Sequence, residues 1–562
     1  MKKYNEMSLG IKKAETVIKG GSIVNVFTKE IYKADVALAG GMIIGVGNYQ
    51  GEKEIDATGK VICPGFIDSH LHLESTLVSP VQLIEEASKW GTTTFVVDPH
   101  EAANVAGLEG INYMLDATKD AAANVYVMMP SCVPAIETED NGAVILAKDM
   151  LSYKDNERIL GLGEVMDIQS VLDGKDEMLE KIEVFKDKTI DGHAGFLSEK
   201  EIMCYRLAGI ETDHECIDFE TARMEARAGI SVLIREGTAA KNLDAIVKGI
   251  LKEGISTSDF AFCTDDKHID DINKEGHISY NIKRAIELGM KPVDAITMAT
   301  YHGAKIYGLK HLGAIAPGYQ ADLVILSDLE RVEIEAVFHK GEPISRENHG
   351  KIEEPSKQLL NTVHIEKFRK KDLKLKLTKT KAPIINLIEN QIQTALSLEE
   401  VPRNGDVFTE NAIYNKVAVV ERHHNTGKIG VGICKGYGIK GGAVATTFSH
   451  DSHNLVMIGD NDNDMYLAAK ELEKSGGGYV IVSGGKVVHR LDLPIMGLMS
   501  NRNHEEVSKN LSLMIDALRN MGVPKGVDPF ITLSFLALPV IPEVRITTRG
   551  VYQVGRSKQL EF

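Results

Sequence analysis

The sequence lacks the features by which several classes of protein are recognised. Its six cysteines contain no Cys-x-x-Cys pair, a pattern typical of free, mostly buried thiols in a reducing cytosol. No run of about 18 apolar residues occurs, so we expect no membrane span, and the first residues lack the apolar core of a signal peptide. The 80 acidic and 64 basic residues give a net charge of −16, which argues against a nucleic-acid partner. We therefore expect a cytoplasmic protein that binds neither membranes nor nucleic acid.

The chain of 562 residues is too long for one ordinary core and predicts a large barrel with additional units. From about residue 63 to residue 311, apolar runs typical of strands alternate with segments of helical spacing, such as 77–90 and 176–187. The strand candidates are 62–70, 92–98, 125–131, 159–165, 189–193, 210–214, 230–235 and 260–265. Eight strand–helix units in about 250 residues are typical of an α/β fold of the TIM type, the (β/α)₈ barrel. An open doubly wound sheet would often carry a glycine-rich phosphate loop after its first strand, and none is present.

Short strand candidates flank the barrel region on both sides. Before it, the segments 34–39 and 42–47 are joined by Gly40-Gly41, where glycine adopts positive φ freely, and they predict a hairpin. After it, residues 312–345 again indicate short strands, which we expect to pair with those of residues 13–62. The predicted units are a small discontinuous β domain (1–62 with 312–350), the barrel (63–311), a charged linker (351–382) and a C-terminal α+β domain (383–562).

The most informative stretch is Pro64-Gly65-Phe66-Ile67-Asp68-Ser69-His70-Leu71-His72, an apolar strand that ends in two histidines. Side chains two residues apart on a strand point the same way, so His70 and His72 can bind one divalent metal ion together. Imidazole suits zinc, iron and manganese-type centres. The pair alone is weak evidence, because two polar residues at a strand end are common.

Almost every other predicted barrel strand also ends in polar residues, and active sites of such barrels lie at the C-terminal ends of the strands. Taken singly, a histidine there is more often a hydrogen-bonded loop residue, and an aspartate more often a helix N-cap. If each residue had only such a structural role, the full order His-x-His, Glu, His, His, Asp at the strand ends would need a series of coincidences. The predicted metal ligands are His70, His72, Glu164, His193, His214 and Asp265.

These six side chains can support hydrolysis. Four imidazoles and two carboxylates can hold two divalent ions, and the two oxygens of Glu164 can bridge them. A bound cation lowers the pKa of its water toward ~7, so that the metal-bound hydroxide becomes a strong nucleophile at neutral pH. Asp265 can take the proton and later deliver it to a leaving group.

The residues at this point resemble a known family. The segment 61–72 resembles the signature of the amidohydrolase superfamily, and the segment 318–324 resembles the motif of its closing β domain. The runs His70-Leu71-His72-Leu73-Glu74-Ser75-Thr76, Asp98-Pro99-His100-Glu101 and Gly163-Glu164-Val165-Met166 resemble the bacterial adenine deaminases, as do residues 441–443 and 449–454. The resemblance implies hydrolysis of adenine to hypoxanthine and ammonia in purine salvage, with manganese or iron as the metals. We also expect a homo-oligomer.

Two alternative functions make different predictions. A cyclic-amide hydrolase of the same superfamily would bridge its metals with a carboxylated lysine on strand 4, where this chain has Glu164. A non-catalytic barrel that serves as a binding module would have lost ligand positions, and none is lost. The other known deaminase design has His-x-Glu followed by Pro-Cys-x-x-Cys. His72-Leu73-Glu74 matches its first half, but the second half is missing.

Two further residues are candidates for contact with the substrate. Glu101 would contact a ring nitrogen or move the proton of the leaving amine; the alternative is that it orients a ligand histidine. The polar segment 450–454 allows three interpretations: a cap over the barrel mouth, a separate metal site at His450, Asp451 and His453, or a solvated loop. Under the cap hypothesis, His453 binds the purine.

Overall fold

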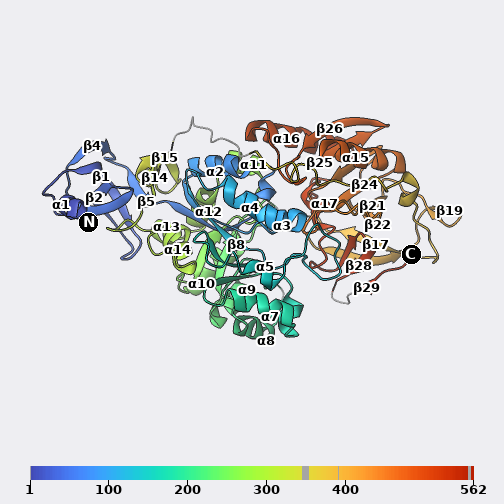
Figure 1. The fold of residues 1–562 in the computed structure, drawn as a ribbon, viewed down its shortest axis with the longest axis horizontal. Helices are drawn as coiled ribbons and strands as arrows, with labels where there is room; N and C mark the ends of the chain where they lie inside the picture. The colour runs from blue at the N-terminus through green and yellow to red at the C-terminus, as the bar shows by residue number, and fades with distance from the viewer. Residues whose placement is uncertain (1, 196, 239, 345–353, 390, 555–557) are drawn as a thin grey trace.

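The structure is a computed structural model that describes residues 2–195, 197–238, 240–344, 354–389, 391–554 and 558–562. The molecule is elongated, with a small β-sheet at one end, a barrel in the middle and the C-terminal unit at the other end (Figure 1). The N-terminus lies with the small sheet, and the C-terminus lies in the C-terminal unit.

The small sheet combines strands from both sides of the barrel region. They are β1 (Ala14–Asn25), β2 (Glu30–Ala39), β3 (Met42–Gly47), β4 (Gly51–Asp56), β5 (Val61–Pro64), β14 (Leu323–Asp328), β15 (Glu333–His339) and β16 (Glu342–Pro343), preceded by helix α1 (Lys2–Ser8). β14 pairs antiparallel with β5, so the segment after the barrel completes the sheet that the N-terminal strands begin. β2 and β3 form the predicted hairpin, and Gly40 and Gly41 adopt φ of 58° and 76° at its turn.

The middle of the molecule contains eight parallel strands, which overlap the eight predicted ones. They are β6 (Phe66–Leu71), β7 (Thr92–Val97), β8 (Asn124–Met129), β9 (Ile159–Val165), β10 (Thr189–Gly192), β11 (Thr212–Asp213), β12 (Ser231–Arg235) and β13 (Phe260–Cys263). β6 to β10 form one parallel sheet and β11 to β13 another. The sheets meet at two seams: the Glu211 N–H donates to the Ile190 carbonyl at 2.9 Å, and Leu71 forms a parallel bridge with Asp265. The fold is thus an α/β barrel of the TIM type with further units.

Helices follow the barrel strands and cover their outer face (Figure 1). They include α2 (Pro80–Lys89), α3 (His100–Ala106), α4 (Leu108–Ala117), α7 (Asp176–Val184), α8 (Glu199–Leu207), α9 (Phe219–Ala228), α10 (Leu243–Glu253), α11 (Ile269–Glu275) and α12 (Ile278–Glu287). Side chains alternate along β7: Phe95 and Val97 pack in the core shared with helix residues such as Leu83, whereas Val96 packs inside the barrel with Met128. The barrel strands are thus buried on both faces, and the predicted ligands lie at or just after their C-terminal ends.

The first predicted barrel strand, 62–70, is in fact two strands. β5 belongs to the small sheet and β6 to the barrel, and the chain passes from one to the other at Gly65. A side chain at Gly65 would meet Thr93 Oγ1 at 2.0 Å, and the Gly65 N–H donates to the Asp322 carbonyl at 2.8 Å. Pro64-Gly65 marks this junction in the sequence. The apolar residues on both sides of it do not show that the two strands belong to different sheets.

The C-terminal unit is built on a mainly antiparallel sheet of eight strands in the order β18-β17-β22-β21-β24-β23-β25-β26. These are β17 (Ala382–Leu387), β18 (Thr394–Glu399), β21 (Tyr414–Val420), β22 (Ile429–Lys435), β23 (Gly442–Thr446), β24 (Leu455–Gly459), β25 (Gly478–Ser483) and β26 (Lys486–Asp492). Its longer helices are α15 (Asp462–Ser475) and α16 (His504–Asn520); the short α17 (Ile531–Phe535) and strands β27 (Val544–Thr547) and β28 (Gly550–Gln553) follow. Ile365, Phe368 and Leu373 are buried in the same core as Met457 and Leu472. Much of the segment predicted as a linker therefore packs into this unit.

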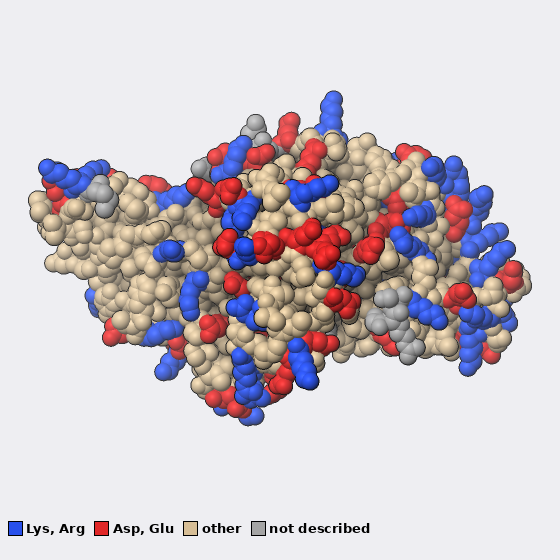
Figure 2. Space-filling view, turned by 60° about the horizontal axis from the view of Figure 1, so that its bottom comes forward, with Lys and Arg blue, Asp and Glu red and all other residues tan. Residues whose placement is uncertain are grey.

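All six cysteines are free thiols; Cys204 is exposed and the other five are buried. Within the described ranges, none of the helices is both long and apolar enough to cross a bilayer. On the face drawn in Figure 2, acidic side chains gather across the middle of the molecule, and lysines and arginines gather at the end formed by the C-terminal unit.

Candidate metal centre and active site

The structure brings all six predicted ligands together at one rim of the barrel. His70 lies in β6 and His72 follows it, Glu164 lies near the end of β9, and the other three follow β10, β11 and β13. Five of the six are buried, and His193 has a side chain that is 19% exposed. Groups such as His70, His72 and Asp265, or His70, Glu164 and His214, place their ligand atoms within 4.8 Å of one another, a spacing that could hold a metal ion.

Glu164 lies at the centre of this cluster. Its Oε1 lies 3.4 Å from His72 Nε2 and 3.3 Å from His100 Nδ1. Its Oε2 lies 2.6 Å from His193 Nδ1 and 3.3 Å from His214 Nε2. Burial opposes ionisation, yet the charge of His214 and the close imidazoles of His100 and His193 hold the pKa of Glu164 well below its usual value. The carboxylate thus faces two groups of imidazoles, one with each oxygen.

Asp265 approaches the same nitrogen of His72 that faces Glu164. Its Oδ1 is 3.0 Å from His72 Nε2 and 3.7 Å from His70 Nε2, and its Oδ2 accepts a hydrogen bond from Arg235 at 2.8 Å. Its backbone φ is 57°, in the left-handed region that non-glycine residues seldom adopt. Burial would raise the pKa of Asp265, but Arg235 and His72 hold it well below the usual range. A strained backbone and a buried arginine therefore fix an ionised carboxylate against the histidines.

The histidines are oriented to present free nitrogens. His72 Nδ1 lies 2.8 Å from the Asp98 carbonyl oxygen, to which its N–H donates, so that Nε2 is left as the ligand atom. Both ring nitrogens of His70 and Nδ1 of His100 are buried without a hydrogen-bond partner among the described residues. Buried polar atoms of this kind are rare without a reason, and a metal ion would satisfy them.

The structure adds residues that the sequence did not single out as members of the site. His100 joins the cluster through Glu164, and Arg235 pairs with both Asp265 and Glu215. His100 could have been found from the sequence, because the run Asp98-Pro99-His100-Glu101 directly follows strand β7. Arg235 also ends a barrel strand, β12, but an arginine does not fit a search for metal ligands.

The polar loop of the C-terminal unit reaches the barrel mouth, as the cap hypothesis predicts. His450 Nδ1 lies 3.2 Å from Glu101 Oε1, and Asp451 Oδ1 lies 3.7 Å from His100 Nε2. Glu101 also accepts a hydrogen bond from Ser75 at 3.2 Å, and burial raises its pKa to about 8. The proposed role of Glu101 as a partner of other site residues and its role as a substrate contact both remain predictions.

His453 lies close to this junction but does not line the cavity described below. Its Nδ1 accepts a hydrogen bond from the Ser449 N–H at 3.1 Å, so a neutral ring carries its proton on Nε2. That Nε2 is buried without a hydrogen-bond partner among the residues that the structure describes. His450 and Asp451 with His100, and His450 and His453 with Glu101, place their ligand atoms within 4.8 Å of one another. A separate metal site at His450, Asp451 and His453 therefore stays a prediction beside the cap.

Two adjoining cavities lead to the cluster. The inner cavity, of about 40 Å³, is lined by the strand-end residues on one side. The C-terminal unit supplies the other side with Ile392, His450, Asp451, Phe535, Leu538 and Ile541. The outer cavity, of about 1040 Å³, shares several residues with it, among them Arg235, Ile392 and Ile541. The site is therefore bounded by two units of the chain, and the outer cavity adjoins it through the shared lining residues.

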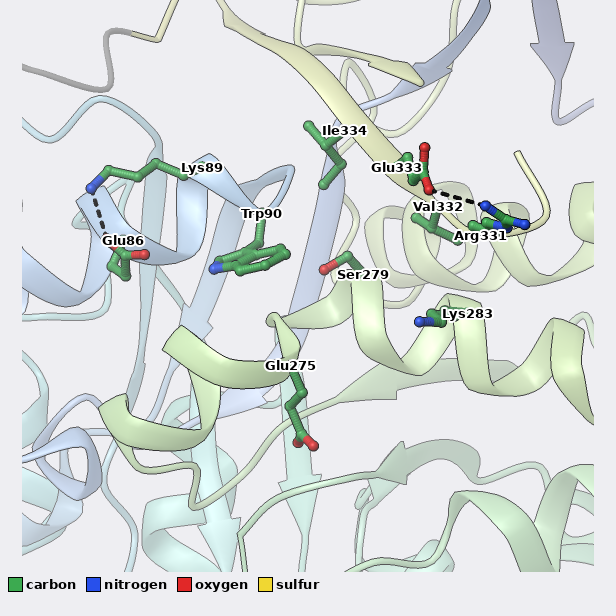
Figure 3. A pocket seen from close by; sticks show the side chains of 10 residues that line it. All are labelled: Glu86, Lys89, Trp90, Glu275, Ser279, Lys283, Arg331, Val332, Glu333 and Ile334. Carbon is green, nitrogen blue, oxygen red and sulfur yellow. Dashed lines mark hydrogen bonds and ion pairs between the residues drawn. The ribbon is translucent and has the colours of Figure 1, made fainter. Parts of the chain in front are cut away.

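A third cavity, of about 470 Å³, lies elsewhere on the barrel (Figure 3). It is lined by residues of α2, α11, α12 and β15, and it shares no residue with the cluster. Its charged groups largely pair with one another: Glu86 with Lys89 at 2.7 Å, and Glu333 with Arg331 at 3.7 Å. It carries none of the predicted chemistry.

Comparison with known proteins agrees with this arrangement. Residues 61–344 match the amidohydrolase family, and residues 391–558 match the adenine deaminase C-terminal domain. The fold and the strand-end site are those of an amidohydrolase. The chain is 52% identical over 562 residues to an adenine deaminase of Desulfitobacterium hafniense (strain Y51), covering 100% of this chain and 99% of the relative. It is 44% identical over 564 residues to an adenine deaminase of Clostridium acetobutylicum, covering 99% of each. The chain belongs to the adenine deaminase family.

Among solved structures, a β-aspartyl dipeptidase from Fervidobacterium islandicum AW-1 is similar to this chain with a TM-score of 0.46 and 18% identity. The match covers 61% of this chain and 99% of the dipeptidase. At this level of similarity it carries no argument about activity.

Proposed function

We propose that this chain hydrolyses adenine to hypoxanthine and ammonia, with two divalent cations held at the barrel mouth. The observation that carries the proposal is the position of Glu164, whose two oxygens face two different groups of imidazoles. A buried carboxylate in this position suits a bridging ligand. Relatives named adenine deaminase match over the whole chain, and they supply the substrate of the proposal.

The residues present fit a centre of two cations. His70, His72 and Asp265 would hold one, and His193 and His214 would hold the other, with Glu164 shared between them. When bound, the cations would lower the pKa of a water molecule and supply a nucleophile near neutral pH. Nitrogen and oxygen ligands without cysteine suit the manganese or iron that we propose.

Asp265 is the proposed proton carrier. Arg235 engages Oδ2, which leaves Oδ1 facing the cluster where the attacking water would lie. A positioned carboxylate can accept the water's proton and return it to the exocyclic nitrogen, which must be protonated before it leaves as ammonia. Arg235 therefore orients the carboxylate and keeps it ionised.

The C-terminal unit would complete the purine site. His450 and Asp451 line the inner cavity, and the ring of Phe535 stacks on that of His450 with centroids 4.8 Å apart. Enclosure of this kind excludes water and holds a flat substrate while the intermediate forms. Glu101 would act on the purine or through His450, and His453 would act from behind the cavity lining.

The test uses protein reconstituted with manganese or iron. Ammonia release and hydrolysis are measured on a panel of purines and cyclic amides, together with the metal content. We expect turnover of adenine and about two metal equivalents per chain, since six ligands exceed one tetrahedral site. Turnover of a cyclic amide instead would indicate the alternative hydrolase, and no turnover by fully loaded protein would indicate a binding module. The domain boundaries, a homo-oligomer and a cytoplasmic location also remain predictions.

A further inference from the structure

The inner cavity, of about 40 Å³, lies between the strand-end residues of the cluster and one segment of the C-terminal unit. Phe535 and Leu538 line this cavity, Pro539 and Val540 line the outer one, and Ile541 lines both. We call the segment 535–542 the wall. Because the wall borders both cavities, its displacement would open the site to a purine.

One buried side chain binds the wall at several points. Arg545, in β27, is 1% exposed and donates its Nε–H to the Ile541 carbonyl at 2.7 Å and an Nη1–H to the Phe535 carbonyl at 3.2 Å. Its Nη2 donates to the carbonyls of Ile392 and Pro542, at 2.8 and 2.9 Å. Three of these four acceptors belong to residues that line the inner cavity.

Burial of the Arg545 guanidinium is energetically unfavourable, which indicates that the residue has a function in this position. No carboxylate among the described residues lies within ion-pair distance of Arg545, and burial lowers the pKa of its guanidinium. Burying a charge without an ionic partner is unfavourable unless hydrogen bonds compensate for the lost water. A guanidinium is the side chain suited to this task, because its donors form a rigid planar fork that can serve several carbonyls at once.

We propose that Arg545 is a positioning residue for the reaction, which holds the wall closed on the purine by clamping these carbonyls. Opening of the wall would release the carbonyls of Phe535, Ile541 and Pro542, while that of Ile392, outside the wall, stays in place. Arg545 itself does not touch the substrate, so its effect is transmitted through Phe535 and Ile541. The inference rests on the proposed function, since it assumes that a purine occupies the inner cavity.

The experiment compares Arg545→Lys with Arg549→Lys in the metal-loaded protein. A lysine carries its three donors on one nitrogen and cannot span four carbonyls, so we expect KM for adenine to rise about tenfold with a smaller fall in kcat. The metal content should stay unchanged. Arg549 is a matched control, because it lies four positions along the same hairpin with a side chain that is 42% exposed, and its ionic partner is Asp140. Its substitution should leave both constants unchanged.

The outcomes separate the two proposals. Wild-type protein that does not turn over adenine overturns the proposed function and this inference with it. An active wild type, with Arg545→Lys lower in melting temperature but unchanged in KM and kcat, overturns the positioning role alone. If Arg545→Lys does not fold, amide hydrogen exchange of the wild type decides. We expect the amides of 535–542 to exchange faster than those of β27 and to slow severalfold when hypoxanthine is saturating. Exchange that hypoxanthine does not change overturns the inference.

Discussion

Replacement of Asp265 by asparagine tests the centre of the proposed mechanism. The amide keeps the size of the carboxylate, and its oxygen can still accept the hydrogen bond that Arg235 donates at 2.8 Å. It cannot accept a proton from water, and its NH₂ group would face His72 Nε2, which now lies 3.0 Å from Oδ1. The change therefore removes the proton carrier while leaving the shape of the site intact.

The expected effect on activity is large and the effect on stability is small. Loss of a general base costs about 10²- to 10⁴-fold in rate, which corresponds to about 3–5 kcal/mol in the barrier. Arg235 also pairs with Glu215, so its buried charge keeps a partner in the variant. We therefore expect a cooperative thermal transition close to that of the wild type.

The assay is ammonia release from adenine, normalised to metal-loaded protein. Metal analysis is needed because Asp265 is also a proposed ligand, and a lost equivalent would lower the activity for another reason. Asp259→Asn is the matched control, since it lies immediately before β13, at the end opposite to Asp265, with a side chain that is 60% exposed. A fully loaded Asp265→Asn variant that keeps kcat within tenfold of the wild type would refute the reasoning and move proton transfer to Glu101.

The remaining predictions concern the metals, the cap and a buried acid. Glu164→Gln offers a single oxygen without charge, so metal analysis should show less than two equivalents and activity should vanish; full loading would contradict a bridging role. His450→Ala should raise KM for adenine more than His453→Ala does, because His450 lines the inner cavity, and the reverse order in steady-state kinetics would contradict the assignment. Burial, with the nearby Asp213, raises the pKa of Glu225 from 4.5 to about 10. Protonated Glu225 contributes fully to the free energy of unfolding below pH 4.5, and this contribution is lost as the pH rises toward 10. The free energy of unfolding should therefore fall less over this pH range in Glu225→Gln than in the wild type. Parallel pH profiles of the two proteins in chemical denaturation would contradict this.

The barrel and the ligand residues at its rim could be predicted from the sequence alone. Strands of a barrel are buried on both faces and the active site lies at their C-terminal ends, so polar residues at those ends, such as His72 and Asp265, are the candidates for the site. Parallel strands bring these ends to one rim, and the six predicted ligands accordingly lie together in the structure. Local pattern and a general rule of fold geometry were enough for this part.

Only the tertiary structure decided where the chain changes sheets and what covers the rim. A run of apolar residues predicts that a strand is buried but does not predict which strand it pairs with. The sequence therefore did not show that the chain passes at Gly65 from the small sheet to the barrel. The approach of His450 to Glu101 joins positions 349 residues apart in the chain (450 − 101) and depends on how the C-terminal unit packs against the barrel. The hydrogen bonds of Arg545 depend on the same packing, because backbone carbonyls carry no sequence signal of their own.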